Sequence, residues 1–236
     1  MGKRLITQRR GKGSLTYKSP EHRYHYQIEL PITNEKLIGN VVDLIKDPAR
    51  SAPTAVVKFS NNFQMTVPAP LGVRIGDEVN YNDNSIVSPL SVLQLMNIPE
   101  GTLIYNIESS PGDNGKFCRS AGTVARIITK TNEYVLVELP SKKQRKFNPK
   151  CRAIIGMISG GGRTEKPILK AGKKHHMMRA KNKLYPKTSG VAMNAVDHPF
   201  GSGRGRHVGK PKTPPKNAPP GRNIGLIRAR RTGRKR

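Results

Sequence analysis

The last 86 residues of this 236-residue chain are too charged and too rich in glycine to form a core of their own. Residues 151–236 contain 22 basic and 2 acidic residues, together with 13 of the 23 glycines and 8 of the 19 prolines. Their apolar clusters are short and show no sustained helical or strand periodicity. Burial of these clusters therefore does not offset the entropic cost of ordering the backbone, roughly 1–2 kcal/mol per residue. We expect this segment to be largely disordered alone and to take its shape from a partner.

The charge of the whole chain indicates which partner this is. The formal net charge is +28, and residues 151–236 carry +20 of it, an excess that favours a polyanion. An anionic membrane surface fits less well, because no apolar run approaches about 20 residues and no secretory apolar segment follows the first basic residues. Ile6 also stands where myristoylation requires Ser or Thr. We therefore expect a nucleic acid and no membrane partner.

Residues 36–150 have an ordinary globular composition, with a net charge of +4, and predict β-structure. Runs rich in β-branched residues alternate with turn formers, and the predicted strands lie within residues 36–47, 54–70, 124–129, 134–139 and 151–159. Strands spaced by about 8–12 residues are typical of small barrels, and the length suits two of them. We place the boundary within residues 85–102, where residues 91–96 form either a strand or a short helix.

One helix is predicted, within residues 164–184. Thr164 is a suitable N-cap, Pro167 is tolerated in a first turn, and Gly172 weakens the prediction. A basic hairpin-like stretch, residues 141–147, lies inside the globular part. It is either a barrel loop that faces the polyanion or a solvated turn.

An acid and an imidazole are adjacent in "GVAMNAVDHPFGSGRGRH", residues 190–207. Nucleophilic catalysis needs a nucleophile, a base and an orienting group on a packed scaffold, and no apolar wall surrounds Asp197 and His198. "GSGRG", residues 201–205, lacks the strand and helix of a dinucleotide-binding fingerprint. We expect no catalytic residue here, but a turn whose glycines let the backbone lie on a phosphodiester chain.

Metal and redox chemistry are not expected. Cys118 and Cys151 are too few and too far apart for a disulfide framework or a zinc knuckle, and they fit small buried residues of a reduced intracellular protein. His175 and His176 are adjacent and do not easily share one tetrahedral ion. We predict no metal site and no cofactor, and any Mg²⁺ would be a counterion bound to RNA.

The basic clusters favour folded RNA over DNA. The chain has 5 Phe and no Trp, so a stacking platform for single strands is not obvious, and no helix carries a major-groove array. Extensions of Gly, Pro, Lys and Arg suit the grooves and junctions of an irregular RNA. Two alternatives remain: an acyl-transfer enzyme that uses Asp197 and His198, and a basic protein that compacts DNA.

These motifs together resemble the universal large-subunit ribosomal protein family "L two". Residues 190–207 carry the most specific match, and "TQRRGKGS", "IPEGT", "RSAGT", "CRAIIG" and "KPILKAGKKHH" occur in the expected order, so that the resemblance covers nearly the whole chain. Ala195 and Phe200 stand where bacterial relatives typically carry Pro and a second His. This difference favours an archaeal-type protein and removes one titratable group from any proton relay.

The resemblance implies a mainly β fold, with an OB-fold barrel at residues 36–88 and an SH3-like barrel at 89–162. Basic extensions at 1–35 and 163–236 would then lie in large-subunit rRNA. It also implies roles in subunit association, tRNA binding and the peptidyl-transferase region, with Asp197 and His198 near that region in a supporting role. The expected location is the cytoplasmic ribosome. Partners would be rRNA, neighbouring ribosomal proteins and, indirectly, tRNA and small-subunit rRNA, with no homo-oligomer.

The predicted rRNA contacts are mainly cations, joined by the residues of the turn at 190–203. They are Lys3, Arg4, Arg9, Arg10, Lys12, Arg119, Lys173, Lys174, His175, His176, Arg179, Lys181, Lys183, Gly190, Asn194, Asp197, His198, Gly201, Gly203, Arg204, Arg206, Arg222, Arg228, Arg230 and Arg231.

Overall fold

The computed structural model describes residues 2–31, 33, 35–48, 50–83 and 87–227. The chain divides into two compact units. One contains residues 21–167, and the other joins the residues up to Pro20 to those from Ile168 onward. The arginines predicted at 228, 230 and 231 lie outside the described residues.

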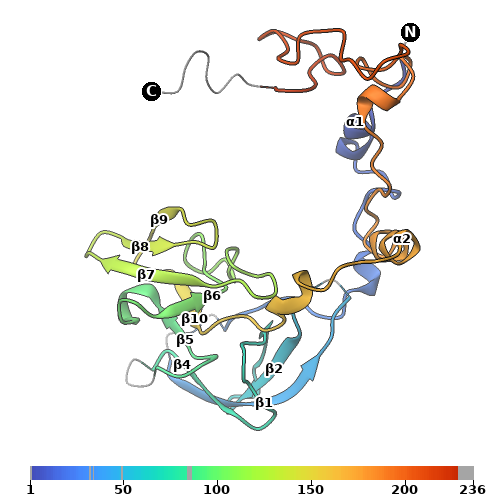
Figure 1. Ribbon diagram of the computed structural model, residues 1–236. Coiled ribbons are helices and arrows are strands. Elements are labelled where there is room, and N and C mark those ends of the chain that lie inside the picture. Colours follow the sequence, from blue (N-terminus) through green and yellow to red (C-terminus); the bar gives the residue numbers. More distant parts are fainter. Residues whose placement is uncertain (1, 32, 34, 49, 84–86, 228–236) are drawn as a thin grey trace. The chain divides into compact units, whose positions relative to one another are not determined.

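The unit of residues 21–167 is built from one ten-stranded sheet, in the order β3-β2-β1-β4-β5-β10-β6-β7-β8-β9 (Figure 1). All neighbouring strands are antiparallel except β4 and β5, which are parallel. The strands are β1 Leu37–Ile45, β2 Thr54–Phe59, β3 Gln64–Pro68, β4 Glu78–Tyr81, β5 Val92–Gln94, β6 Leu103–Tyr105, β7 Ala125–Lys130, β8 Val135–Glu138, β9 Gln144–Phe147 and β10 Arg152–Ile155. The predicted mainly β fold is confirmed.

Two apolar cores lie against this sheet, and the central strands contribute to both. On β5, Val92 belongs to the first core and its neighbour Leu93 to the second. On β10, Ile154 points to the first core, whereas Ala153 and Ile155 point to the second. Successive side chains of a strand face opposite sides, so a strand between two cores must be apolar at every position. Two cores are compatible with two barrels that share a wall.

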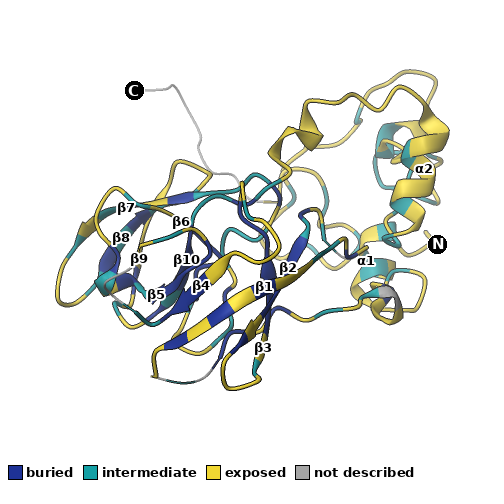
Figure 2. Ribbon diagram, turned by 90° about the horizontal axis from the view of Figure 1, so that it is seen from below, coloured by how far each residue is buried: buried dark blue, intermediate teal, exposed yellow. Residues whose placement is uncertain are grey.

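Strand β1 shows the other pattern, in which one face is buried and the other is exposed (Figure 2). Leu37, Gly39 and Val41 are buried and alternate with exposed residues up to a register shift after Val41. A Cβ at Gly39 would lie 2.7 Å from the Lys58 carbonyl oxygen. The lack of a side chain at this position therefore lets β1 and β2 approach closely.

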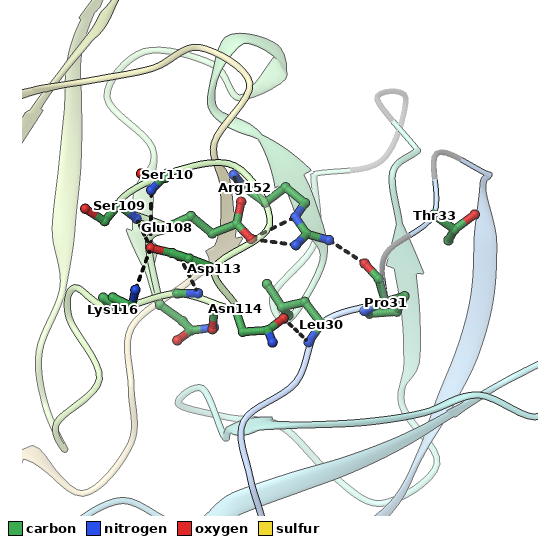
Figure 3. Close-up of polar contacts among 12 residues, drawn as sticks. Leu30, Pro31, Thr33, Glu108, Ser109, Ser110, Asp113, Asn114, Lys116 and Arg152 are labelled. Carbon is green, nitrogen blue, oxygen red and sulfur yellow. Dashed lines mark hydrogen bonds and ion pairs between the residues drawn. The ribbon is translucent and has the colours of Figure 1, made fainter.

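A buried ion pair joins Arg152 on β10 to Glu108, which lies just after β6 (Figure 3). The guanidinium of Arg152 donates to Glu108 Oε1 at 2.5 and 3.0 Å, and the Arg152 backbone N–H donates to Glu108 Oε2 at 2.8 Å. The same guanidinium also donates to the carbonyl of Pro31 and, at 2.7 Å, to the hydroxyl of Tyr81. Burial alone would lower the pKa of Arg152, but the bonds to Glu108 and Tyr81 raise it. The charge of the fully buried Glu108 is thus matched by Arg152, whose side chain is largely buried.

The loop after Glu108 is held by one carboxylate (Figure 3). Asp113 accepts backbone N–H groups from Ser109, Ser110 and Gly115, at 3.0 to 3.2 Å. Burial would raise the pKa of Asp113, but these bonds and Lys116 lower it. Asp113 therefore fixes the turn that includes Ser109, Ser110 and Gly115.

Helices are short, and the predicted helix within 164–184 is only partly correct. The helix α2 spans Ala171–Arg179, and no side chain caps it. Thr164 instead ends the 3₁₀ helix η3, Gly161–Thr164, so its prediction as an N-cap is wrong. Exposed Ile168 and Leu169 find no core there, and short helices depend on such packing. The sequence did not indicate α1, Ile6–Gly11, or the 3₁₀ helices η1 Glu21–Arg23 and η4 Gly190–Ala192.

Residues 91–96, left open between strand and helix, contain both. Strand β5 runs directly into the 3₁₀ helix η2, Leu95–Asn97. Of the described residues, none forms a helix long and apolar enough to cross a bilayer.

The unit built from the chain ends has almost no core. None of residues 168–227 is buried, and helix α2 is largely exposed (Figure 2). In the N-terminal part of this unit, Leu5 and Pro20 are buried. The structure therefore agrees with the composition, which predicts that this segment does not bury enough apolar surface to be stable alone.

Candidate nucleic-acid interface

Residues 193–202 form a compact double turn. The carbonyl oxygen of Asn194 accepts the backbone N–H groups of Asp197 and His198, at 3.0 and 3.1 Å. The chain then closes again, as the N–H of Gly201 donates to the His198 carbonyl at 2.8 Å. A Cβ at Gly201 would overlap the Asn194 backbone. Glycine is therefore required at position 201 for the two segments of the turn to come this close.

The imidazole of His198 is a structural part of this turn. Its Nδ1 accepts the backbone N–H of Phe200 at 3.0 Å, which needs a neutral ring with its proton on Nε2. Partial burial lowers the pKa of His198 and favours this neutral form. The ring lies over Gly190, where a Cβ would come within 2.6 Å of Nε2, and 5.2 Å from the ring of Phe200.

Asp197 does not orient this ring. Its carboxylate lies 3.8 Å from the Lys3 ammonium, and both side chains are exposed. Among the described residues, no hydrogen bond joins this carboxylate to the His198 ring. Because Nδ1 is already an acceptor for the backbone, the pair lacks the carboxylate-to-imidazole bond of a catalytic triad.

The N-terminal segment lies against the same turn. The backbone N–H of Lys3 donates to the Val196 carbonyl at 2.8 Å. A cavity of about 540 Å³ lies between them, lined by Arg4 and Gln8 on one side and by residues 195–199 and 220–221 on the other. Lys3 and Arg4, two of the predicted rRNA-binding residues, thus line the same cavity as Asp197 and His198.

A second group of predicted contacts gathers around α2. The helix carries Lys173, Lys174, His175, His176 and Arg179. The two histidine rings are exposed and lie edge to face, with centroids 5.4 Å apart. None of these side chains is buried, so the helix presents its charge to solvent.

Four further predicted contacts, all arginines, differ in their surroundings. Arg204, Arg206 and Arg222 are exposed to solvent. Arg119 belongs to the other unit, is half-buried, and donates to the Gly115 carbonyl at 3.0 Å. Its burial, and then the charge of Arg50, lower its pKa. The structure thus gives Arg119 a role in holding a loop of its own unit.

The sequence left the basic hairpin of residues 141–147 undecided, and the structure orders two of its cations. The Arg145 guanidinium lies 4.5 Å from the ring of Phe117 and 5.4 Å from that of Phe147. Lys146 lies 3.8 Å from the ring of Tyr134. Both are on β9, an edge strand. The sequence does place aromatic residues near these basic ones, which is a signal for cation–π contacts. Which cation lies over which ring is known only from the structure.

The cysteines are free thiols. Cys151 is buried and Cys118 half-buried. Burial raises the pKa of both to about 11, with a further contribution from Glu108 at Cys151. They are therefore protonated and unreactive near neutral pH. Within the described part of the chain, no three His, Cys, Asp or Glu side chains group as metal ligands.

The comparisons with known proteins agree along the whole chain. Residues 89–218 match the family described as "Ribosomal Proteins L2, C-terminal domain". The Large ribosomal subunit protein uL2 of Archaeoglobus fulgidus is 49% identical over 237 residues, and that of Methanothermobacter thermautotrophicus is 50% identical over 241, each with 100% of both chains covered. The Haloarcula marismortui protein of the same name is 47% identical over 239 residues, with 99% of this chain and 98% of its own covered. This chain therefore belongs to the L2 family of ribosomal proteins, in its archaeal type.

Proposed function

We propose that this chain is a structural constituent of the large ribosomal subunit that binds large-subunit rRNA. The observation that carries this proposal is the contrast between the two units. Most of the positive charge lies in residues 151–236, and residues 168–227 bury no side chain. A charged segment without a core is suited to thread through RNA, which supplies both counter-charge and contacts.

The folded sheet and the chain ends have different tasks in this proposal. The sheet has two cores and a buried ion pair, so it is a rigid body that keeps its shape without RNA. The ends carry phosphate contacts, which position a protein on RNA without reading its sequence. Arg204 and Arg206, flanked by glycines in an exposed loop, are suited to such contacts.

The double turn around His198 has a structural role near the peptidyl-transferase region and takes no part in the chemistry. Its imidazole accepts a backbone N–H and lies over Gly190, so it fixes backbone shape and transfers no proton. Subunit association and tRNA binding would follow indirectly, through the rRNA that the turn holds in place. The chain acts in the ribosome, beside neighbouring ribosomal proteins, as a non-enzymatic component without a cofactor, and any Mg²⁺ would be a counterion bound to the rRNA.

Salt dependence tests the electrostatic part of this proposal. If about 10 cations of the ends neutralise phosphates, the logarithm of rRNA affinity falls with the logarithm of salt concentration, at a slope of about −7 to −9. The measurement is a filter-binding titration of the full chain with large-subunit rRNA. A nearly flat dependence contradicts the proposal, and a preference for duplex DNA over folded rRNA would favour a DNA-compacting protein.

A further inference from the structure

A second cavity, of about 700 Å³, lies within the unit built from the chain ends. Its apolar lining consists of Tyr17, Met178, Leu184, Tyr185 and Pro186. None of these side chains is fully buried, so aromatic and aliphatic surface faces the opening. Pockets of roughly 300–1,000 Å³ with such linings accept ring-sized ligands.

The backbone around α2 builds this cavity. Lys174 and Met178 are one helical turn apart and therefore lie on the same face. After the helix the chain reverses, with the N–H of Lys183 donating to the Met178 carbonyl at 2.9 Å. The amide of Asn182 then donates to the Lys18 carbonyl at 2.7 Å. This bond ties the N-terminal segment, with Tyr17, to the turn that carries Tyr185.

The charges around the cavity have one sign. Arg10, Lys174, Lys183 and Lys187 line it, and no acidic residue does. The ammonium of Lys174 lies 5.2 Å from the ring of Tyr185, close enough for a cation–π contact. A ligand that complements this site has a flat ring for the aromatic walls and negative charge for the rim. A nucleotide within an RNA strand has both.

We propose that this cavity receives an unstacked base of large-subunit rRNA, while Arg10 and the three lysines contact the flanking phosphates. Single-stranded loops and bulges offer such bases, and proteins hold them by stacking on aromatic side chains. The proposal rests on the rRNA-binding function and adds a defined base-binding site to it. An apolar side chain of a neighbouring protein is the competing occupant, but it would leave the four cations without counter-charge.

Two substitutions separate stacking from charge. Stacking releases no counterions, so Tyr17→Leu should weaken rRNA binding by about 5- to 100-fold while the salt slope stays the same. Tyr17→Phe keeps the ring and should bind like the unaltered chain. Lys187→Gln should weaken binding and make the slope shallower by about one. Each is measured by titration of the full chain with large-subunit rRNA over a range of salt concentrations.

The outcome is distinguishable from a failure of the proposed function. If the unaltered chain binds rRNA with a steep salt slope but Tyr17→Leu stays within twofold of it, the base site is overturned and the function stands. If the unaltered chain shows no salt-dependent binding, the function itself fails.

Ultraviolet crosslinking of the unaltered chain in assembled subunits provides a test that does not depend on how a variant folds. Digestion with nuclease and protease, followed by mass spectrometry, should find a nucleobase attached to the peptide of Tyr17 or Tyr185. An adduct from these peptides to another protein alone, or no adduct while other basic segments crosslink, overturns the proposal.

Discussion

The contact between His198 and Gly190 makes a sharp test of the turn at the scale of single residues. A methyl group at Gly190 would overlap the imidazole, so Gly190→Ala should displace the ring and break its bond to the Phe200 N–H. Loss of the hydrogen bonds that hold the turn costs roughly 1–2 kcal/mol. We therefore expect the affinity for rRNA to fall about tenfold. The matched control is Gly172→Ala in α2, where nothing lies within 4 Å and the helix should gain roughly 0.5–1 kcal/mol.

The same imidazole gives the turn a pH dependence. Burial lowers the pKa of His198 below its ordinary value of 6.5, so the folded state takes up a proton less readily than the unfolded state. The stabilising effect is therefore complete above pH 6.5 and is lost as the pH falls through the lowered pKa. NMR titration of the ring in the full chain should show this lowered pKa, and a value above 6.5 would contradict a partly buried ring that accepts a backbone N–H.

At the scale of elements, the Glu108–Arg152 pair makes a prediction about the sheet. Replacing Arg152 by Met removes the partner of a fully buried carboxylate, which costs about 3–5 kcal/mol for such pairs. We expect a lower midpoint in chemical unfolding, and a smaller loss in the double variant with Glu108→Leu. A surface pair such as Lys36 with Asp83 is the control, since exposed pairs contribute at most about 1 kcal/mol.

The elements also show where sequence reasoning succeeds and where it stops. The strands were predictable because β-branched runs and turn formers mark them locally, and β1, β7, β8 and β10 lie within or beside the predicted ranges. The start of the helix at Ala171 was not predictable. The N-cap signal at Thr164 has no effect, because the residues after it have no apolar surface to pack against. The contact of Arg145 with Phe117 joins residues that are distant in sequence. The tautomer of His198 depends on the exact backbone geometry that brings the Phe200 N–H to its ring, so no local sequence pattern reveals either feature.

At the scale of the whole molecule, the two units should respond differently to protease and to RNA. Residues 21–167 contain both apolar cores, whereas residues 168–227 bury nothing. In RNA-free buffer we therefore expect trypsin to remove both ends quickly and to leave a resistant fragment close to residues 21–167. Cleavage follows the population of open states, and the lysines and arginines of the ends offer many sites.

Addition of large-subunit rRNA should protect the ends, because the bound RNA supplies the contacts that the chain itself lacks. Repeating the digestion in high salt with rRNA present should restore rapid cleavage, since phosphate contacts weaken with salt. An equal amount of a non-nucleic polyanion such as heparin controls for trapping by charge alone and should protect less than rRNA. Ends that resist trypsin without any RNA would show that they fold by themselves, and the division of labour between sheet and extensions would be wrong.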